Sequence, residues 1–399
     1  MISYDEALKL VVDSAFLTDV EVRPISQCAG RVLASDIRAP FAMPRFDNAA
    51  VDGYALGHPE SSHPYRILGE VAAGSDYGRP LAASTSVRIF TGAPTPQETF
   101  AVVMQEDVQA EEQILTLADP PKSGANIRRK GEEFIEGELV LPKSTLLNAA
   151  GLAILASFGF EATSIHKEPR VAVLPTGAEL VRPGRELVNG QIYESNSVAL
   201  LASLAHLGIR ANCSLPIGDT IDRTQDALEQ AMEGSDAIIT SGGVSVGDHD
   251  SVRSAALALG FREVFWRVAI KPGKPVFFAM HGKKALFGLP GNPMSALATY
   301  KLLVEPFIKR CMGFANPEPI FFQGRLTNDV KHKMGRREFM PAISSIQKGQ
   351  VALTVIEGQG SHMLGGMARA NCFLDFPCDR PSMEADEVVL FMPFGVSNL

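Results

Sequence analysis

The sequence predicts a multidomain α/β plus β protein: a central three-layer α/β domain with a mostly parallel sheet, a small inserted β domain, a helical linking domain and a C-terminal β domain. A length of 399 residues corresponds to about two or three domains. Strand-like and helix-like segments alternate over residues 170–313, and parallel neighbours need such crossover connections. The flanking segments instead carry short β-type runs separated by turn residues.

The N-terminal part begins with an expected helix at 4–17, whose apolar residues recur at helical spacing behind Ser3, a candidate N-cap. Pairing with a second expected helix at 147–158 would make the β segment between them an insertion. We therefore expect a discontinuous helical linking domain (1–40 with 138–168) and an inserted β domain (41–137). Within the latter, β-type runs lie at 66–71, 86–90, 101–105 and 114–117.

The α/β domain is expected at 169–318 and the C-terminal β domain at 319–399. In the first, we expect strands at 171–174, 213–217, 237–240, 264–270, 276–280 and 285–289 and helices at 198–207, 224–232 (introduced by Asp222), 251–259 and 294–311. In the second, strands are expected at 321–326, 351–355, 372–376 and 387–391, with no long helix. Ligands of an open α/β sheet bind beyond the carboxyl ends of its strands.

The composition narrows the class of protein. With 46% hydrophobic and 21% charged residues the chain is globular. The net charge of −8 argues against nucleic acid or an anionic membrane as a partner. The five cysteines form no C-x-x-C pair, so we expect reduced thiols rather than zinc or redox chemistry. An acidic N-terminus and no apolar run near the roughly 20 residues of a membrane span predict a cytoplasmic protein.

Three small-residue turns follow predicted strands of the α/β domain. They contain Thr176 and Gly177, then Ser241, Gly242 and Gly243, and finally Gly288, Pro290, Gly291, Asn292 and Pro293. Glycines let a backbone approach a ligand, and helix-start N–H groups favour anions, so together the turns indicate phosphate binding. Each turn alone is also explained as a tight βα connection. Asn292 as N-cap and Pro293 at the first helical position need no ligand.

Charged residues surround these turns. Lys271 and Lys274 stand on a proline-fixed loop and are either an anion site or a solvated turn. Glu179, Asp219 and Asp250 follow strands at the same edge. Acids beside a phosphate repel it unless a divalent cation lies between them, so we infer a magnesium–phosphate site. His249 has no second ligand at zinc spacing.

The N-terminal half has two further polar clusters. Asp47, Asn48 and Asp52 lie among small residues, and Thr91 stands in a Thr-Gly-Ala-Pro turn. A basic run occupies 126–132. Taken alone, these clusters are explained better by structure than by function: the first two as turns, and the basic run as a solvated charged turn.

Several motifs together resemble the molybdopterin molybdenumtransferase family, which includes the E domain of gephyrin. The similarity spans nearly the whole chain. The matching stretches are FDNAAVDGYA (46–55), IFTGAPTP (89–96), VVMQED (102–107), NIRRKGEE (126–133), PTGAEL (175–180), SGGVSVGDHD (241–250), AIKPGKP (269–275) and GLPGNPMSA (288–296).

The resemblance implies an enzyme that takes adenylated molybdopterin and molybdate, cleaves the phosphoanhydride with Mg²⁺ and releases AMP. It makes 169–318 the molybdopterin-binding domain and the C-terminal domain barrel-like. Carried over by motif, catalytic roles are implied for Asp52, Thr91, Glu179, Asp219 and Asp250, the last two as ligands of Mg²⁺. The resemblance also points to Lys271, Lys274, Pro290, Pro293, Arg336 and Ser361 as substrate-binding residues, beside the turn residues named above.

The family forms a homodimer in which the β domain of one subunit completes the other's cleft, so Asp52 and Thr91 are expected to act in trans. Molybdopterin adenylyltransferase, the source of the adenylated substrate, is a further expected partner. Two residues depart from the family pattern: Ala178 replaces a common Asp, and Ser251 a common Tyr. Two rival functions remain, a gephyrin-like dimeric scaffold and a molybdopterin adenylyltransferase. The scaffold is weakened by the retained acid and lysine set, and the adenylyltransferase by the additional domains.

Overall fold

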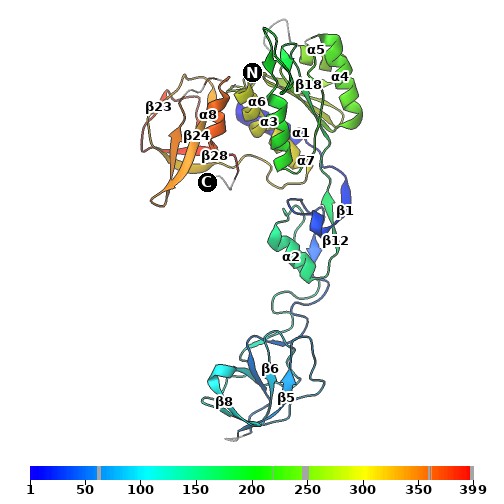
Figure 1. The fold of residues 1–399 in the computed structure, drawn as a ribbon, viewed down its shortest axis with the longest axis vertical. Helices are drawn as coiled ribbons and strands as arrows, with labels where there is room; N and C mark the ends of the chain where they lie inside the picture. Colours follow the sequence, from blue (N-terminus) through cyan, green and yellow to red (C-terminus); the bar gives the residue numbers. More distant parts are fainter. Residues whose placement is uncertain (61–63, 219, 245–250, 358–359, 361, 396–399) are drawn as a thin grey trace. The chain divides into compact units, whose positions relative to one another are not determined.

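The computed structural model describes residues 1–60, 64–218, 220–244, 251–357, 360 and 362–395 (Figure 1). Their contacts form two compact units. The first contains residues 1–34, 144–149 and 162–399, and the second contains residues 35–143 and 150–161.

The first unit is built around a six-stranded mixed sheet. Its strand order is β16 (Asn212–Cys213), β13 (Val171–Pro175), β17 (Ala237–Ser241), β21 (Lys284–Leu289), β20 (Phe277–His281) and β18 (Arg262–Trp266). The first four are parallel, and β20 and β18 are antiparallel additions at one edge. Pro175 lies opposite Ser241, which lies opposite Leu289, so three strands end level with one another.

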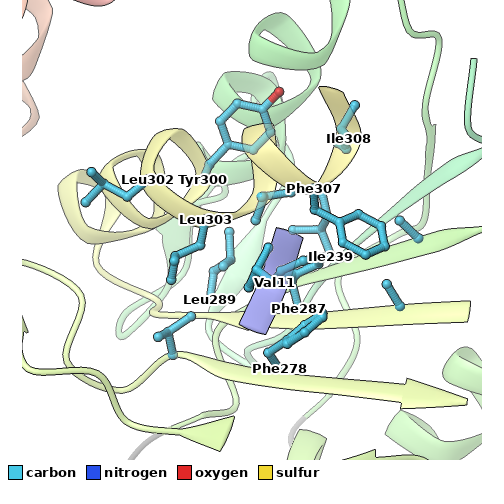
Figure 2. Packing of buried hydrophobic residues seen from close by; sticks show 14 of the residues in the cluster. Val11, Ile239, Phe278, Phe287, Leu289, Tyr300, Leu302, Leu303, Phe307 and Ile308 are labelled. Atoms are coloured by element: carbon cyan, nitrogen blue, oxygen red, sulfur yellow. The ribbon is translucent and has the colours of Figure 1, made fainter. Parts of the chain in front are cut away.

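Helices cover both faces of this sheet, which confirms the three-layer prediction. On one face α4 (Ile221–Gly234) and α5 (Ser251–Ala258) pack side by side over Ile238 and Leu286. On the other face lie α1 (Tyr4–Ser14), α3 (Asn196–His206) and the helical segment 293–311. Figure 2 shows that core, in which the Phe278 and Phe287 rings stack with centroids 4.6 Å apart.

The N-terminal helix packs against a part of the protein that its sequence does not predict. Ser3 is its N-cap, as predicted, and accepts a hydrogen bond from the Glu6 N–H at 3.1 Å. However, Ala7 and Val11 are buried in the α/β core rather than against the second expected helix. The residues after α1 form β1 (Val20–Pro24), which pairs with β12 (Ala162–His166), and the short helix η1 (Ile25–Gln27).

The long helix expected at 294–311 is continuous but changes type. It runs as α6 (Pro293–Thr299), a π-helical segment (Tyr300–Val304) and α7 (Glu305–Cys311). Pro306 lacks an N–H group and cannot make the ordinary helical hydrogen bond, which explains the wider turn before it. Tyr300 and Phe307 are completely buried on this segment (Figure 2).

Three local predictions were wrong. The strand expected at 213–217 is only the two-residue β16, which ends at Cys213. The run 264–270 is not one strand, because Arg267 has φ of 72° and turns the chain out of the sheet. Its second part, β19 (Ile270–Lys271), pairs with a strand of the C-terminal region. In α4 the N-cap is Thr220, whose side chain accepts from the Arg223 N–H at 3.4 Å, and Asp222 lies within the first turn.

The C-terminal region is a closed five-stranded barrel, as the resemblance implied. The strands are β22 (Phe322–Leu326), β24 (Arg337–Gln347), β25 (Gln350–Val355), β26 (Cys372–Phe376) and β28 (Val388–Pro393), and β24 also pairs with β26 to close the ring. A small ladder joins β23 (Val330–Lys331) to β27 (Ser382–Met383), and α8 (Leu364–Arg369) is a short helix. The expected strands are present, but β24 and α8 were missed.

The second unit is the β-rich part expected from the sequence. Its main sheet has the order β7 (Ala101–Met104), β4 (Gly53–Leu56), β6 (Thr85–Ile89), β5 (Tyr65–Val71), β9 (Ile114–Leu117) and β8 (Val108–Glu111), with η2 (Gln105–Asp107) after β7. Smaller ladders join β3 (Asn48–Ala49) to β10 (Ile127–Arg128) and β2 (Ile37–Arg38) to β11 (Leu139–Leu141). After α2 (Ala149–Ser157), Phe158 packs its ring against Phe41 and Phe134.

All five cysteines are free in the structure. No helix among the described residues is long and apolar enough to cross a membrane.

Candidate active site

Three turns meet at the carboxyl edge of the parallel sheet. They follow the adjacent strands β13, β17 and β21. The Thr176 N–H donates to the Ser241 carbonyl at 2.9 Å, and the Gly242 N–H donates to the Leu289 carbonyl at 2.9 Å. The sequence prediction that these turns cluster at one sheet edge is therefore confirmed by direct hydrogen bonds.

The glycines of the middle turn are required by this close packing. Gly242 has φ of 99°, and a Cβ there would lie 2.5 Å from the Thr176 carbonyl oxygen. Gly243 has φ of 68°, and its Cβ would lie 2.7 Å from a methyl group of Val252. Gly291 is different, because the nearest atom to a Cβ there would be Gly242 Cα at 3.7 Å. It is exposed and leaves room beside the turn.

Gly288 has a packing role. It is buried at the end of β21, where a Cβ would lie 2.5 Å from Val244 Cγ1 and 3.2 Å from Phe277 Cβ. Asn292 is the N-cap residue of α6 and Pro293 is its first residue, as the sequence predicts. Pro290 is buried beside them.

Asn196 links two of the turns and was not identified from the sequence. Its Nδ2 donates to Ser241 Oγ at 2.7 Å and to the Gly291 carbonyl at 2.8 Å. It is the first residue of α3, where the buried Glu194 accepts from the Ser197 N–H at 2.8 Å. The Glu-Ser-Asn-Ser pattern before an apolar run was an available helix-start signal.

Glu179 lies just beyond the first turn. The Gly177 N–H donates to the Ile217 carbonyl at 2.9 Å, and a Cβ on Gly177 would lie 2.8 Å from Glu179 Oε2. Both Ala178 and Glu179 are exposed. The Glu179 carboxylate thus folds back over the glycine at the mouth of the turn.

The two lysines lie on a loop at the other end of α6. A Cβ on Gly273, between them, would lie 2.3 Å from Thr299 Cγ2, at the last residue of α6. Both lysines are exposed. Lys271 Nζ lies 2.7 Å from Glu338 Oε1, and Arg336 donates to the Ile270 carbonyl at 3.4 Å. Because α6 has seven residues, its length of about 10 Å separates this basic loop from the glycine turn.

Asp52 and Thr91 form a hydrogen-bonded pair in the second unit. The Thr91 N–H and Oγ1 both donate to Asp52 Oδ1, each at 2.7 Å. These bonds, first the backbone and then the hydroxyl, hold the pKa of Asp52 below its ordinary value, and Arg88 lowers it further. Asp52 is therefore an exposed anion at neutral pH, fixed by the neighbouring turn.

Asp47 has structural contacts instead. Its carboxylate accepts from the Lys130 N–H at 2.7 Å and from Arg129 Nη1 at 2.6 Å. Burial acts to raise the pKa of Asp47, but these two donors outweigh it and lower that pKa. Asp47 thus ties its own turn to the basic run, which is the structural role that the turn-forming alternative gives this residue.

Comparison with known proteins covers almost the full chain. Family models match at residues 2–159 (MoeA N-terminal region, domain I and II), 172–310 (probable molybdopterin binding domain) and 323–394 (MoeA C-terminal region, domain IV). The molybdopterin molybdenumtransferase of Haemophilus influenzae is 36% identical over 99% of both chains. The chain belongs to the molybdopterin molybdenumtransferase family.

Other relatives agree. Molybdopterin molybdenumtransferase 2 of Mycobacterium tuberculosis is 33% identical over 89% of this chain and 90% of its own. The crystal structure of the molybdopterin biosynthesis moeA protein of Pyrococcus horikoshii superposes with a TM-score of 0.85 at 28% identity, covering 98% of this chain and 100% of that one. Membership in the molybdenumtransferase family makes the chain a transferase of molybdenum cofactor biosynthesis.

Of the residues that the family motifs select, Asp219, Asp250 and Ser361 lie outside the described residues, as does His249. Among the residues that are described, no group of three or more His, Cys, Asp or Glu side chains could hold a metal ion. Ser251, which departs from the family pattern, is buried at the start of α5, and its Oγ accepts a hydrogen bond from Thr224 Oγ1 at 3.3 Å.

Proposed function

We propose that the protein inserts molybdate into adenylated molybdopterin, with Mg²⁺-dependent cleavage of the phosphoanhydride and release of AMP. The observation that carries this proposal is the convergence of three turns at the ends of β13, β17 and β21, within a chain of the molybdenumtransferase family. Closely packed glycine turns suit a phosphate-bearing ligand because backbone can approach it without side-chain obstruction.

Each group of residues has a proposed task. Thr176, Gly177, Ser241–Gly243 and Gly288–Pro293 form the edge that receives the pterin phosphate. The cations beyond α6 are proposed to bind the anionic oxygens of the substrates; they are Lys271, Lys274 and Arg336. Ser361 is proposed as a further contact with the substrate.

The carboxylates are proposed to act around the phosphoanhydride. Asp52, with Thr91 holding it, and Glu179 are the described members, and Asp219 and Asp250 are the proposed ligands of Mg²⁺. Carboxylate oxygens are the hard ligands that Mg²⁺ requires, so this donor set fits the ion. Bound Mg²⁺ would neutralise phosphate charge.

We also propose a homodimer in which Asp52 and Thr91 complete the partner's site. Exposed apolar side chains support an interface near β14 (Leu180–Val181), β15 (Ile192–Tyr193) and the start of α3: Leu187, Val188, Ile192, Tyr193 and Val198 are 40–67% exposed. Clustered exposed apolar residues mark interaction surfaces. We also propose that the domains have the boundaries expected from the sequence.

The test is a reconstitution. Purified protein is mixed with adenylated molybdopterin, Mg²⁺ and molybdate, and AMP is quantified by chromatography. We expect AMP release that needs both molybdate and the metal. No release in a folded dimer would favour the scaffold function. Formation of adenylated molybdopterin from ATP and molybdopterin would instead identify an adenylyltransferase.

A further inference from the structure

Lys271 has a buried partner in the C-terminal barrel. β19 runs parallel to β24, with Lys271 opposite Glu338. The Lys271 Nζ lies 2.7 Å from Glu338 Oε1, with the lysine side chain 45% exposed and the glutamate 4% exposed. A cation at the protein surface is therefore attached to a carboxylate inside the barrel.

The second oxygen of Glu338 is also engaged. It contacts Nδ1 of His332, a side chain that is only 2% exposed. His332 is fixed in turn, because its backbone N–H donates to the Pro381 carbonyl at 2.9 Å and its ring lies 4.9 Å from that of Phe376. Nε2 of His332 is buried without a hydrogen-bond partner among the described residues.

The contact with Glu338 decides which nitrogen of His332 carries the proton. A carboxylate oxygen can only accept, so Nδ1 is the donor, and a second hydrogen on the buried Nε2 would have no acceptor among the described residues. The favoured tautomer therefore has its hydrogen on Nδ1, donating to Glu338, as expected when a carboxylate accepts at that position. Each oxygen of Glu338 then has one donor. Of the three linked side chains, His332 and Glu338 are buried and the Lys271 ammonium reaches solvent.

The neighbouring Arg337 shows what a purely structural ion pair looks like in the same strand. It donates to both oxygens of Asp375, at 2.7 and 2.6 Å, and to Asp5 at 2.8 Å. Its guanidinium also covers the Tyr4 ring at 4.9 Å. Arg337 thus joins barrel to helix, whereas Glu338 directs one oxygen toward a lysine at the surface.

We propose that Glu338 and His332 are positioning residues, which hold the Lys271 ammonium in place for the anionic substrate. A free lysine must lose the freedom of four side-chain torsions when it binds an anion. A lysine already fixed by a buried carboxylate loses less, and orientation of this kind contributes to rate. The substrate's part in this inference rests on the proposed function, but the placement of Lys271 does not.

The first test measures Lys271 without any substrate. Wild-type and variant proteins are treated with a limiting amine-acylating reagent, and the modified peptides are quantified by mass spectrometry. In Glu338→Gln, which keeps the shape but removes the charge, we expect Lys271 to react about fivefold faster because its ion pair is lost. Lys274, on the same loop, is the internal control and should keep its rate.

His332 variants separate positioning from packing and serve if Glu338→Gln does not fold. In His332→Asn, the side-chain amide can donate from the place of Nδ1, so Lys271 should react as in wild type. In His332→Leu, which fills the site without a donor, Lys271 should react faster. Equal Lys271 rates in wild type and a folded Glu338→Gln, or in the two His332 variants, would overturn the proposal.

The second test uses turnover. We expect Glu338→Gln to lower kcat/KM by roughly tenfold, mainly through KM. The double variant with Lys271→Ala should then be no worse than Lys271→Ala alone, because both changes remove one interaction. Additive losses would overturn the positioning role. An inactive wild-type protein would refute the proposed function instead, and the acylation rates would still decide how Lys271 is held.

Discussion

Gly242→Ala should disrupt the junction of the three turns. The glycine has φ of 99°, donates its N–H to Leu289 and packs directly on Thr176. An added methyl group would meet the Thr176 carbonyl oxygen at 2.5 Å and its Oγ1 at 2.8 Å. Backbone cannot move aside as a flexible side chain does, so the two turns must separate.

The magnitude follows from two terms. A non-glycine residue held in a sparsely populated backbone region costs about 1–3 kcal/mol. Forcing extra atoms into a packed site typically adds about 1–3 kcal/mol. We therefore expect the free energy of unfolding to fall by roughly 3 kcal/mol. For an m-value near 2 kcal/mol/M, the urea midpoint would then be lower by about 1.5 M.

The assay can be confined to the relevant sheet. The chain has one tryptophan, Trp266, which ends β18 of the same sheet, so its fluorescence during urea unfolding reports on this part of the protein. Gly291→Ala is the matched control, since its nearest contact would be an ordinary 3.7 Å and its φ is not positive. If Gly242→Ala and Gly291→Ala unfold at the same urea concentration, the steric reasoning is wrong.

Four further predictions concern activity and pH. Asp52→Ala should lower molybdate-dependent AMP release about a hundredfold or more without unfolding the protein; circular dichroism controls for folding, and near-normal turnover would remove its catalytic role. Mixing Asp52→Ala with Asp250→Asn subunits should restore roughly a quarter of wild-type activity if sites are completed in trans, whereas no recovery after proven exchange would place each site within one chain. Lys274→Ala should weaken substrate binding more at low than at high ionic strength, and a salt-independent loss would contradict an electrostatic role. Burial acts to raise the pKa of Glu305, but two lysines one turn away on either side lower that pKa overall. The ionised Glu305 should therefore stabilise the fold above pH 4.5, and this contribution should disappear as the pH falls through the folded pKa. A difference in unfolding free energy between wild type and Glu305→Gln that persists at lower pH would contradict this.

The sequence predicted the central domain well because its signal is local. Each strand of the parallel sheet is a short apolar run, and the crossover helices between them leave no other simple topology. The turns after β13, β17 and β21 could be placed together for the same reason. Asn196 escaped prediction because its hydrogen bonds reach Ser241 and Gly291, which are 45 and 95 residues away in the chain.

β24 was missed for a different reason. Pro341 stands inside it, and proline normally excludes a central strand because it cannot donate to the ladder. In the barrel, β24 pairs with β26 over residues 338–342 and with β25 over residues 342–347. The proline therefore lies where the strand changes partner, a circumstance that only the closed barrel reveals.

The two lysines of the 271–274 loop show how far sequence can go. In the sequence the two lysines look equivalent. In the structure, however, Lys271 pairs with Glu338, whereas Lys274 makes no ion pair within the described part of the chain. A paired ammonium contributes direction more than net charge, because its partner cancels the long-range field. An unpaired one contributes mainly that field, which salt screens. Loss of Lys274 should therefore depend on ionic strength more strongly than loss of Lys271, a difference that arises from a contact 67 residues away in sequence and from no feature of the loop itself.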